Sequence, residues 1–384
     1  MRNRLFLDLP VYTRRLASTR NRLLPHPSTQ FSLRFEDGIN TASERWHENK
    51  AIDDPFSCAL LNRYTMGNMY SQIYPPKSLF SVDQIPDLTG QVMLVTGGNA
   101  GIGKETCKAL LNGNAKVYLA ARSKSKADEA IEWLKQETNG KAPIFLELDL
   151  ANLDSIRKAV EEFKSKEQEL HVLFNNAGVM KPPIEQKTAN GYDLQFGTNV
   201  LGPYFFTTLL LPTLIHTVKN SPLARGHARV VNTSSSAVYF APEGGIVWET
   251  LGTDESSVQA CQKLGTNGLY AQSKLGNVLF SNRLAKHYAD QGIISSSLNP
   301  GSIRTELQRH LPWLVREILA LLFHHPASYG ALTQLWSGTM PEGETHNGQF
   351  LIPWARLGDP GQYGRDEKLG EKLWVWLEEQ VKGH

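Results

Sequence analysis

From Gln91 onward, short apolar or β-branched runs alternate with segments of helical periodicity, and this alternation limits the possible folds more than any other feature. Each run has the length of a strand and precedes a helical pattern. Such units place parallel strands in one sheet and bury both of its faces under helices. The sequence therefore predicts an α/β fold with a single doubly wound parallel sheet. Strands are expected at 92–96, 116–120, 144–148, 172–174, 229–233, 293–298 and 348–352, and helices at 103–112, 126–138, 153–166, 192–214 and 367–381.

The residues before this alternation show no sustained strand or helix period. We therefore expect a poorly ordered N-terminal extension over residues 1–84 and a folded domain over 85–384, interrupted by a Gly- and acid-containing insertion at 241–268 over the mouth of the site. The first 34 residues hold seven arginines and one acid, Asp8. That composition is compatible with a targeting segment and equally with an extension that has no such role. If translation began at Met66, Gly67 would head a myristoylation signal.

The bulk composition argues against several classes of protein. The 384 residues include 40 basic and 38 acidic side chains, so no charge excess points to nucleic acid. Cys58, Cys107 and Cys261 lack metal-ligand spacing and leave one cysteine unpaired in any disulfide scheme, which indicates a reducing compartment and no metal site. No apolar stretch reaches the roughly 20 residues of a membrane-spanning helix. We expect an intracellular, cytoplasmic protein, with a mitochondrial or membrane-peripheral location left open.

A glycine-rich turn, Thr96-Gly97-Gly98-Asn99-Ala100-Gly101-Ile102-Gly103, follows the first expected strand and opens the first helix. Glycines there let backbone N–H groups approach a pyrophosphate at the positive end of the helix. An ordinary strand-to-helix turn could also contain glycines, but the flanking strand and helix favour dinucleotide binding in a Rossmann-like sheet. The residues expected at the cofactor are Gly97, Asn99, Gly101, Ile102 and Gly103.

The end of the second expected strand, Leu119-Ala120-Ala121-Arg122, bears on the choice between NAD and NADP. An acid at this point binds a ribose 2′-hydroxyl, whereas a basic group accommodates a 2′-phosphate. Here the acid is absent, and Arg122 offers a planar group for phosphate. A solvated arginine at a helix start is the alternative. The sequence therefore predicts NADP as cofactor, with NAD less favoured.

Tyr270 and Lys274 lie four residues apart in a helical segment, so they share a helix face. A phenol with a pKa of about 10 is a poor proton shuttle at neutral pH. A neighbouring ammonium favours the phenolate and is expected to lower that pKa towards the working pH. A Tyr/Lys pair alone is common on helix surfaces, so this motif gains meaning only from the motifs around it.

Several further motifs accompany the glycine turn and the Tyr270/Lys274 pair. They are Asn175-Asn176-Ala177-Gly178, Asn199, Ser234-Ser235 and Pro300-Gly301. In this order, over about residues 88–381, the chain resembles the short-chain dehydrogenase/reductase family. It is most similar to the retinol-dehydrogenase-like branch and its fungal relatives, through TGGNAGIGKET and YAQSKLGNVLF.

The resemblance implies a role for each matching residue. Tyr270 would transfer the proton, Lys274 would lower its pKa and bind the nicotinamide ribose, and Ser235 would polarise the substrate carbonyl. Asn199 would hold a water that links Lys274 to solvent. Asp149 would contact the adenine, and Ile303 and Thr305 would hold the carboxamide and phosphate. The remaining expected cofactor contacts are Leu150, Asn176, Ala177, Gly178, Pro300 and Gly301.

Some of these assignments have alternatives. Ser234 or Ser236 could replace Ser235, since the gap from residue 235 to residue 270 is 35 positions (270 − 235), longer than most family members show. Asn199 could merely bridge helices, and Asp149 could be a turn former. Gly276 stands where relatives often have alanine.

The segment 302–326 falls where the family builds its substrate lid, and its residues 311–323 are rich in large apolar groups. This indicates a lipophilic small-molecule substrate. Packing within the protein or peripheral membrane contact would also explain it. The resemblance predicts a homo-oligomeric NADP-dependent oxidoreductase that interconverts a carbonyl and an alcohol, and the fungal relatives suggest a role in secondary metabolism. The alternatives are a non-catalytic dinucleotide sensor or scaffold and an epimerase or dehydratase of the same fold.

Overall fold

An eight-stranded sheet lies at the centre of this computed structural model, which describes residues 69–303 and 325–384. The strand order is β3-β2-β1-β4-β5-β6-β7-β8, and all neighbours run parallel except β7 and β8. This confirms the predicted α/β class with a mostly parallel, doubly wound sheet. The strands span Val92–Thr96 (β1), Lys116–Ala121 (β2), Ile144–Glu147 (β3), Val172–Asn175 (β4), Ala228–Thr233 (β5), Ile293–Leu298 (β6), Phe350–Ile352 (β7) and Arg356–Gly358 (β8).

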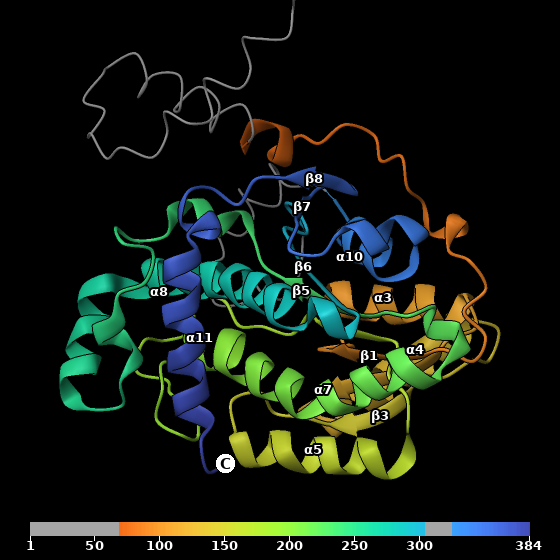
Figure 1. Ribbon diagram of the computed structural model, residues 1–384, viewed down its shortest axis with the longest axis horizontal. Helices are drawn as coiled ribbons and strands as arrows, with labels where there is room; N and C mark the ends of the chain where they lie inside the picture. The colour runs from red at the N-terminus through yellow and green to blue at the C-terminus, as the bar shows by residue number, and fades with distance from the viewer. Residues whose placement is uncertain (1–68, 304–324) are drawn as a thin grey trace, which may run out of the picture. The chain divides into compact units, whose positions relative to one another are not determined.

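Helices cover both faces of the sheet, as Figure 1 shows. Leu110 of α3 and Leu335 of α10 are buried on one face, and Phe163 of α5 and Leu279 of α8 are buried on the other. Because both faces are buried, strands such as β1 and β2 consist mainly of apolar residues. The helices span Gly101–Asn112 (α3), Lys124–Glu137 (α4), Leu153–Lys166 (α5), Leu194–Phe196 (α6), Gly202–Asn220 (α7), Glu255–Tyr288 (α8), Ala327–Thr339 (α10) and Glu367–Val381 (α11).

The helix α10 was not predicted, because two glycines interrupt its sequence and lower its helix propensity. The structure shows why one of them is small. A Cβ at Gly338 would lie 2.4 Å from Cζ of Phe174, so α10 packs directly on β4 through this glycine. The same helix lies beside α3, and together they cover the sheet next to the glycine-rich turn (Figure 1).

A π-helical turn, Gly197–Leu201, joins α6 to α7. The joined helix, Leu194–Asn220, is long and apolar enough to cross a membrane, and it is the one such helix among the described residues. Most of its apolar window, 72%, is buried inside the protein, which is typical of a core helix. The π-helical turn contains Asn199, and turns of this kind often mark functional sites.

The described structure extends further towards the N-terminus than the expected domain start near Ile85. Gln72 is 1% exposed, and its side chain bonds to Tyr239 and Asn299. The guanidinium of Arg356 also donates to the carbonyl oxygen of Ser71. Sequence periodicity could not reveal this segment, because it is held by contacts to distant parts of the chain and has no repeating apolar pattern of its own. Gly67, of the myristoylation signal, lies outside the described residues.

Two buried histidines are expected to make the fold sensitive to acid. Burial lowers the pKa of His346 to about 4, and it also lowers the pKa of His171. His346 lies against the Trp336 ring, with 4.2 Å between ring centroids. Nδ1 of His171 accepts the backbone N–H of Val92 at 3.1 Å, a bond that protonation of Nδ1 would break.

The unfolded chain therefore binds more protons than the folded chain below the ordinary histidine pKa of about 6.5. The free energy of unfolding should fall as the pH falls from about 6.5 towards 4. When the pH is lowered from 7 to 5, the free energy of unfolding of His346→Gln should fall by about 1–2 kcal/mol less than that of wild type, as measured by urea unfolding. The exposed His384→Gln is the control. Equal pH dependence in His346→Gln and wild type would show that His346 does not titrate in this range.

Candidate active site

The strand order reverses at β1, which pairs with β2 on one side and β4 on the other. In such sheets, ligands bind at the carboxyl ends of the strands beside this reversal. A cavity of about 570 Å³ lies there. Predicted site residues that line it are Gly97, Asn99, Gly101, Ile102, Arg122, Asp149, Leu150, Asn176, Ala177, Gly178, Ser235, Tyr270, Lys274, Pro300, Gly301 and Ile303. Gly103 and Asn199 do not line it, and Thr305 lies outside the described residues.

The glycine-rich turn is shaped by backbone conformation and by close approach. Gly97 and Gly101 have φ of 67° and 49°, in the left-handed region that favours glycine. A Cβ at Gly103 would lie 2.3 Å from the carbonyl oxygen of Gly97 and 2.6 Å from Nδ2 of Asn176. Gly103 therefore lets the first turn of α3 pack against the end of β1. This leaves the N-terminus of α3 facing the cavity, where its free N–H groups favour an anion.

The loop after β4 is fixed to the glycine-rich turn by Thr96. The Thr96 hydroxyl accepts the backbone N–H groups of Asn176 and Ala177, each at 3.0 Å. Nδ2 of Asn176 in turn donates to the carbonyl oxygen of Thr96 at 2.9 Å. The two walls of the crevice are thus joined by hydrogen bonds.

Basic residues gather where β2 ends. Arg122 is exposed and lines the cavity together with Ser123 and Lys126. Lys124 is instead engaged by Asp128, 2.8 Å away. Asp149, the carboxylate expected to contact the adenine, lies in the loop after β3 and accepts the backbone N–H of Ala151 at 3.0 Å. The end of β2 therefore offers cations to a ligand phosphate and no acid.

Asn199 is wholly buried and its amide is used by neighbouring groups. Its Oδ1 accepts the N–H of Val179 at 2.8 Å, and its Nδ2 donates to the Val179 carbonyl and to Ser273 Oγ, each at 3.0 Å. A Cβ at Gly178 would lie 3.1 Å from Asn199 Oδ1 and 3.5 Å from Lys274 Nζ. Asn199 therefore holds the loop after β4 against α8, close to Lys274.

Two of the three serines after β5 have different partners. Ser234 donates to the backbone carbonyl of Lys274 at 2.6 Å and is 2% exposed, so it fixes α8 to the sheet. Ser235 makes a side-chain hydrogen bond with Tyr270 and accepts the N–H of Ala237 at 3.1 Å. Of Ser234 and Ser235, Ser235 is therefore the serine that bonds to the phenol of Tyr270. Ser236 also lines the cavity.

Tyr270 and Lys274 share one face of α8, as predicted from their spacing. Nζ of Lys274 lies 5.9 Å from the centroid of the Tyr270 ring and donates to the carbonyl oxygen of Thr233 at 3.0 Å. Burial lowers the pKa of Lys274 to about 8. The group therefore remains mostly protonated at neutral pH, next to the phenol.

The pKa of Tyr270 differs from the expectation that Lys274 brings it towards neutrality. Burial raises the pKa of Tyr270 to about 12, and the hydrogen bond with Ser235 opposes this rise. Desolvation disfavours a buried phenolate, and here it outweighs the hydrogen bond with Ser235. Spacing on a helix shows that two groups are neighbours, but it does not show how deeply they are buried. At neutral pH the phenol of Tyr270 therefore keeps its proton.

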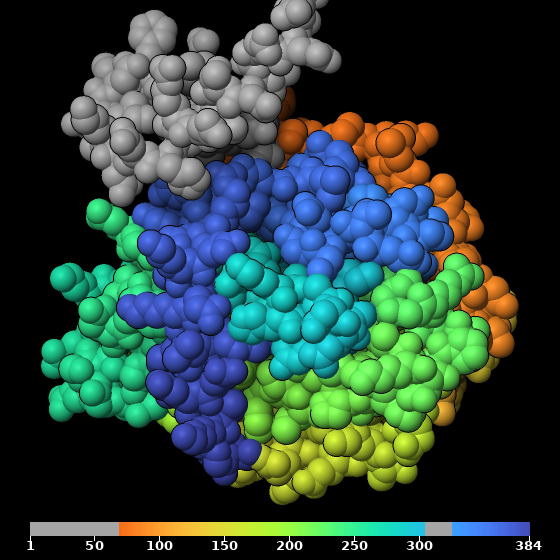
Figure 2. Space-filling model, viewed as in Figure 1, coloured from red at the N-terminus to blue at the C-terminus, as the bar shows by residue number. Residues whose placement is uncertain are grey.

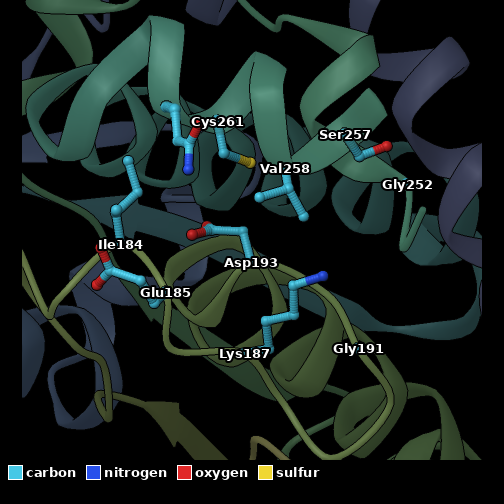
Figure 3. A pocket seen from close by; sticks show the side chains of 10 residues that line it. Ile184, Glu185, Lys187, Gly191, Asp193, Gly252, Ser257, Val258 and Cys261 are labelled. Atoms are coloured by element: carbon cyan, nitrogen blue, oxygen red, sulfur yellow. The ribbon is translucent and has the colours of Figure 1, made fainter. Parts of the chain in front are cut away.

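The insertion 241–268 does not cover this cavity, since none of its residues lines it. It folds into a short turn, Trp248–Leu251, and the first part of α8, which is broken at Gly265. Figure 3 shows Val258 and Cys261 of this part facing Asp193 across a separate cavity of about 140 Å³. Burial raises the pKa of Asp193 to about 6, although its carboxylate caps α6.

The structure also places residues at the large cavity that the motifs did not indicate. The hydroxyl of Thr198 is buried and has no hydrogen-bond partner among the described residues. Lys181 has a left-handed φ of 50°, and its backbone N–H donates to Gln195 at 2.9 Å. The positive φ of a lysine has no sequence signature. Val179, Met180 and Ser302 also line the cavity.

Comparisons with known proteins show the family of this chain. Residues 91–248 match the family described as short chain dehydrogenase. A short-chain dehydrogenase/reductase of Armillaria gallica is 54% identical over 322 residues, which cover 83% of this chain and 100% of that protein.

Solved structures resemble the fold. A 3-ketoacyl-(acyl-carrier-protein) reductase from Brucella melitensis, complexed with NADH, is 21% identical with a TM-score of 0.52 and covers 69% of this chain and 96% of its own. A protein from Escherichia coli CFT073, described as a short chain dehydrogenase and complexed with NADPH, is 23% identical with a TM-score of 0.50, covering 69% and 97%. Likeness at this level of identity concerns the fold alone.

Proposed function

Because this chain belongs to the short-chain dehydrogenase/reductase family of oxidoreductases, we propose that it uses NADPH to reduce a ketone or aldehyde on a small lipophilic substrate. The observation that carries the proposal is the grouping of Ser235, Tyr270 and Lys274 at one cavity. A protein that only binds a dinucleotide has no need of a proton donor, its hydrogen-bond partner and a buried cation together.

The residues present fit a nicotinamide dinucleotide. The left-handed glycines and the N-terminus of α3 form a cradle for its pyrophosphate, and Gly178 leaves space beside Lys274 that a larger side chain would fill. Tyr270, Lys274, Asn176 and Gly301 line the rest of the same cavity. When bound, the nicotinamide would supply the hydride. The structures solved with NADH and with NADPH are consistent with either form.

The side chains of this cavity would handle the proton and the developing charge. The Ser235 hydroxyl would donate a hydrogen bond to the carbonyl oxygen of the substrate, and Tyr270 would give that oxygen its proton. The raised pKa of Tyr270 supports the reducing direction, since the phenol holds its proton at neutral pH. The ammonium of Lys274 would stabilise the tyrosinate left behind. The apolar side chains of Val179, Met180 and Ile303 suit a lipophilic substrate.

The experiment that tests the proposal is oxidation of NADPH, and separately of NADH, by the purified full chain across a panel of lipophilic ketones, aldehydes and quinones. Turnover with NADPH on any member supports the proposal. If the protein bound NADPH without turning over any of these substrates, a sensor or scaffold role would take its place.

Arg122 is expected to set the preference for NADPH. Arg122→Ser should lower kcat/KM with NADPH by about 10- to 100-fold, because a charge-assisted bond to the 2′-phosphate is lost, and should change kcat/KM with NADH little. Lys124→Ser is the matched control at the same helix start, since Lys124 is paired with Asp128. An unchanged ratio of the two kcat/KM values in Arg122→Ser would show that Arg122 does not contact the phosphate.

A further inference from the structure

A buried glutamine from the N-terminal segment connects two walls of the candidate active site. Gln72 is 1% exposed. Its Nε2 donates to the hydroxyl of Tyr239 at 2.8 Å, and its Oε1 accepts Nδ2 of Asn299 at 2.9 Å. Tyr239 lies in the short helix Ser236–Phe240, which directly follows Ser235. Asn299 directly precedes Pro300 and Gly301, which line the cavity.

Four hydrogen bonds of this cluster run in one direction. The N–H of Gly301 donates to Asn299 Oδ1 at 3.0 Å, and Asn299 then donates to Gln72. Gln72 donates to Tyr239, whose hydroxyl donates to the carbonyl oxygen of Asp359 at 2.6 Å. Each amide thus uses its oxygen as acceptor and its nitrogen as donor. Bonds in such a chain polarise one another, and a buried member that loses its partner is costly.

The segment that carries Gln72 is held at the edge of the sheet that β8 forms. Arg356 of β8 donates to the carbonyl oxygen of Ser71 at 2.7 Å. Figure 1 shows the short helix at the start of the described residues beside β8, and Figure 2 shows the residues that follow lying against the C-terminal part. The region that matches the dehydrogenase family, residues 91–248, includes neither Gln72 nor Asn299.

We propose that Gln72 is a positioning residue of the active site, which holds the Ser235 loop and the Gly301 loop at a fixed separation. The inference rests on the proposed function, because it assumes that the Gly301 loop contacts the cofactor and that Ser235 contacts the substrate carbonyl. Through Asn299, Gln72 sets the backbone of Gly301, and through Tyr239 it sets the helix that starts beside Ser235. The N-terminal segment is therefore part of the catalytic architecture.

Three substitutions in the full chain separate the effect of the bond between Gln72 and Tyr239 from that of the bond between Gln72 and Asn299. Gln72→Met keeps the length of the side chain and removes both bonds, so the Kd for NADPH should rise and kcat should fall, each by about tenfold. Tyr239→Phe removes the bonds of the Tyr239 hydroxyl to Gln72 and to Asp359 but keeps the bond between Gln72 and Asn299, so kcat should fall while the Kd for NADPH is unchanged. Asn299→Asp keeps an acceptor for Gly301 but cannot donate to Gln72, so the Kd should rise more than kcat falls.

The variant Gln72→Glu should show a pH dependence that general destabilisation of the protein would not produce. Gln72→Glu keeps an oxygen that accepts from Asn299 but can donate to Tyr239 only when it is protonated, so its kcat should approach that of wild type at low pH and fall further below it as the pH rises, with little change in the Kd for NADPH. Gln84→Met is the matched control, because Gln84 lies in the same segment, is exposed, and bonds only to its own turn at Ser81.

The measurement is the Kd for NADPH by fluorescence titration, with single-turnover rates on the best substrate of the panel and hydrogen exchange at the amide of Gly301. Faster exchange at Gly301 together with a higher Kd in Gln72→Met is the expected result. A folded Gln72→Met with the Kd, rate and exchange of wild type would overturn the inference. If Gln72→Met did not fold, the opposite selectivities of Tyr239→Phe and Asn299→Asp would decide it. Failure of wild type to bind NADPH or NADH would refute the proposed function instead.

Discussion

Tyr270→Phe should lose NADPH-dependent turnover by about 10³-fold while binding NADPH nearly as well as wild type. The substitution removes one oxygen and leaves the ring against α8. Ser235 and Lys274 would remain to polarise a carbonyl and to hold positive charge, but the phenol that gives the substrate oxygen its proton would be missing. Loss of kcat with little change in cofactor affinity is the pattern of an interaction used only in the transition state.

Tyr288→Phe is the matched control for this variant, because Tyr288 lies at the end of the same helix and does not line the cavity. Its turnover should equal that of wild type. Both variants should be compared by steady-state NADPH oxidation and by thermal unfolding. If Tyr270→Phe kept a tenth or more of wild-type turnover, another donor would have to supply the proton, and the assignment of Tyr270 would be wrong.

Gly103→Ala should weaken NADPH binding by about 100-fold or more. The added Cβ would lie 2.3 Å from the Gly97 carbonyl oxygen, a distance that forces the glycine-rich turn and the first turn of α3 apart. Forcing extra atoms into a packed site costs about 1–3 kcal/mol, and here the displaced atoms are those that would face the pyrophosphate. The Kd for NADPH, measured by fluorescence titration, and the melting temperature together report this effect.

Gly370→Ala is the control for Gly103→Ala. Gly370 lies inside α11, and a Cβ there would meet Arg283 at 3.4 Å, an ordinary contact, so the Kd should not change. An alanine at position 103 that left both the Kd and the melting temperature at wild-type values would show that the turn tolerates a side chain. The close approach seen between α3 and β1 would then be irrelevant to binding.

Parallel strands such as β1 and β2 were predictable because nearly all of their residues are buried, so their sequences are mainly apolar runs. All five residues of β1 and all six of β5 are buried. The strand β8 was missed. It has three residues, forms the antiparallel edge, and leaves Leu357 59% exposed, so no pattern marks it. The helix in the insertion was missed because Gly265 breaks its periodicity.

The parts of the site that were predictable are local in sequence. The glycine-rich turn needs its glycines within one strand-to-helix connection, and Tyr270 and Lys274 need only to share a helix face. The direction in which Ser234 and Ser235 point depends on α8, some 40 residues later in the chain, as the bond between Ser234 and Lys274 shows. The raised pKa of Tyr270 depends on burial by the whole fold, which spacing alone does not report.

The contacts of Gln72 could not be predicted from the sequence either, because they depend on the whole fold. Its partners Tyr239 and Asn299 are 167 and 227 residues away in sequence. A glutamine in a stretch without periodicity gives no sign that it is buried. Long-range hydrogen bonds between single polar side chains have no sequence pattern, whereas strands, helices and glycine turns do.

Hydride transfer is the central claim, and the fate of a label tests it most directly. The purified protein is supplied with NADPH carrying deuterium on the transferring carbon of the nicotinamide and with a ketone that it turns over, and the alcohol product is analysed by mass spectrometry. If NADPH transfers a hydride to the carbonyl, the alcohol should carry one deuterium on the former carbonyl carbon, and Tyr270→Phe should form no labelled product in the same time. Alcohol formed without the label, or labelled equally by Tyr270→Phe, would contradict this prediction.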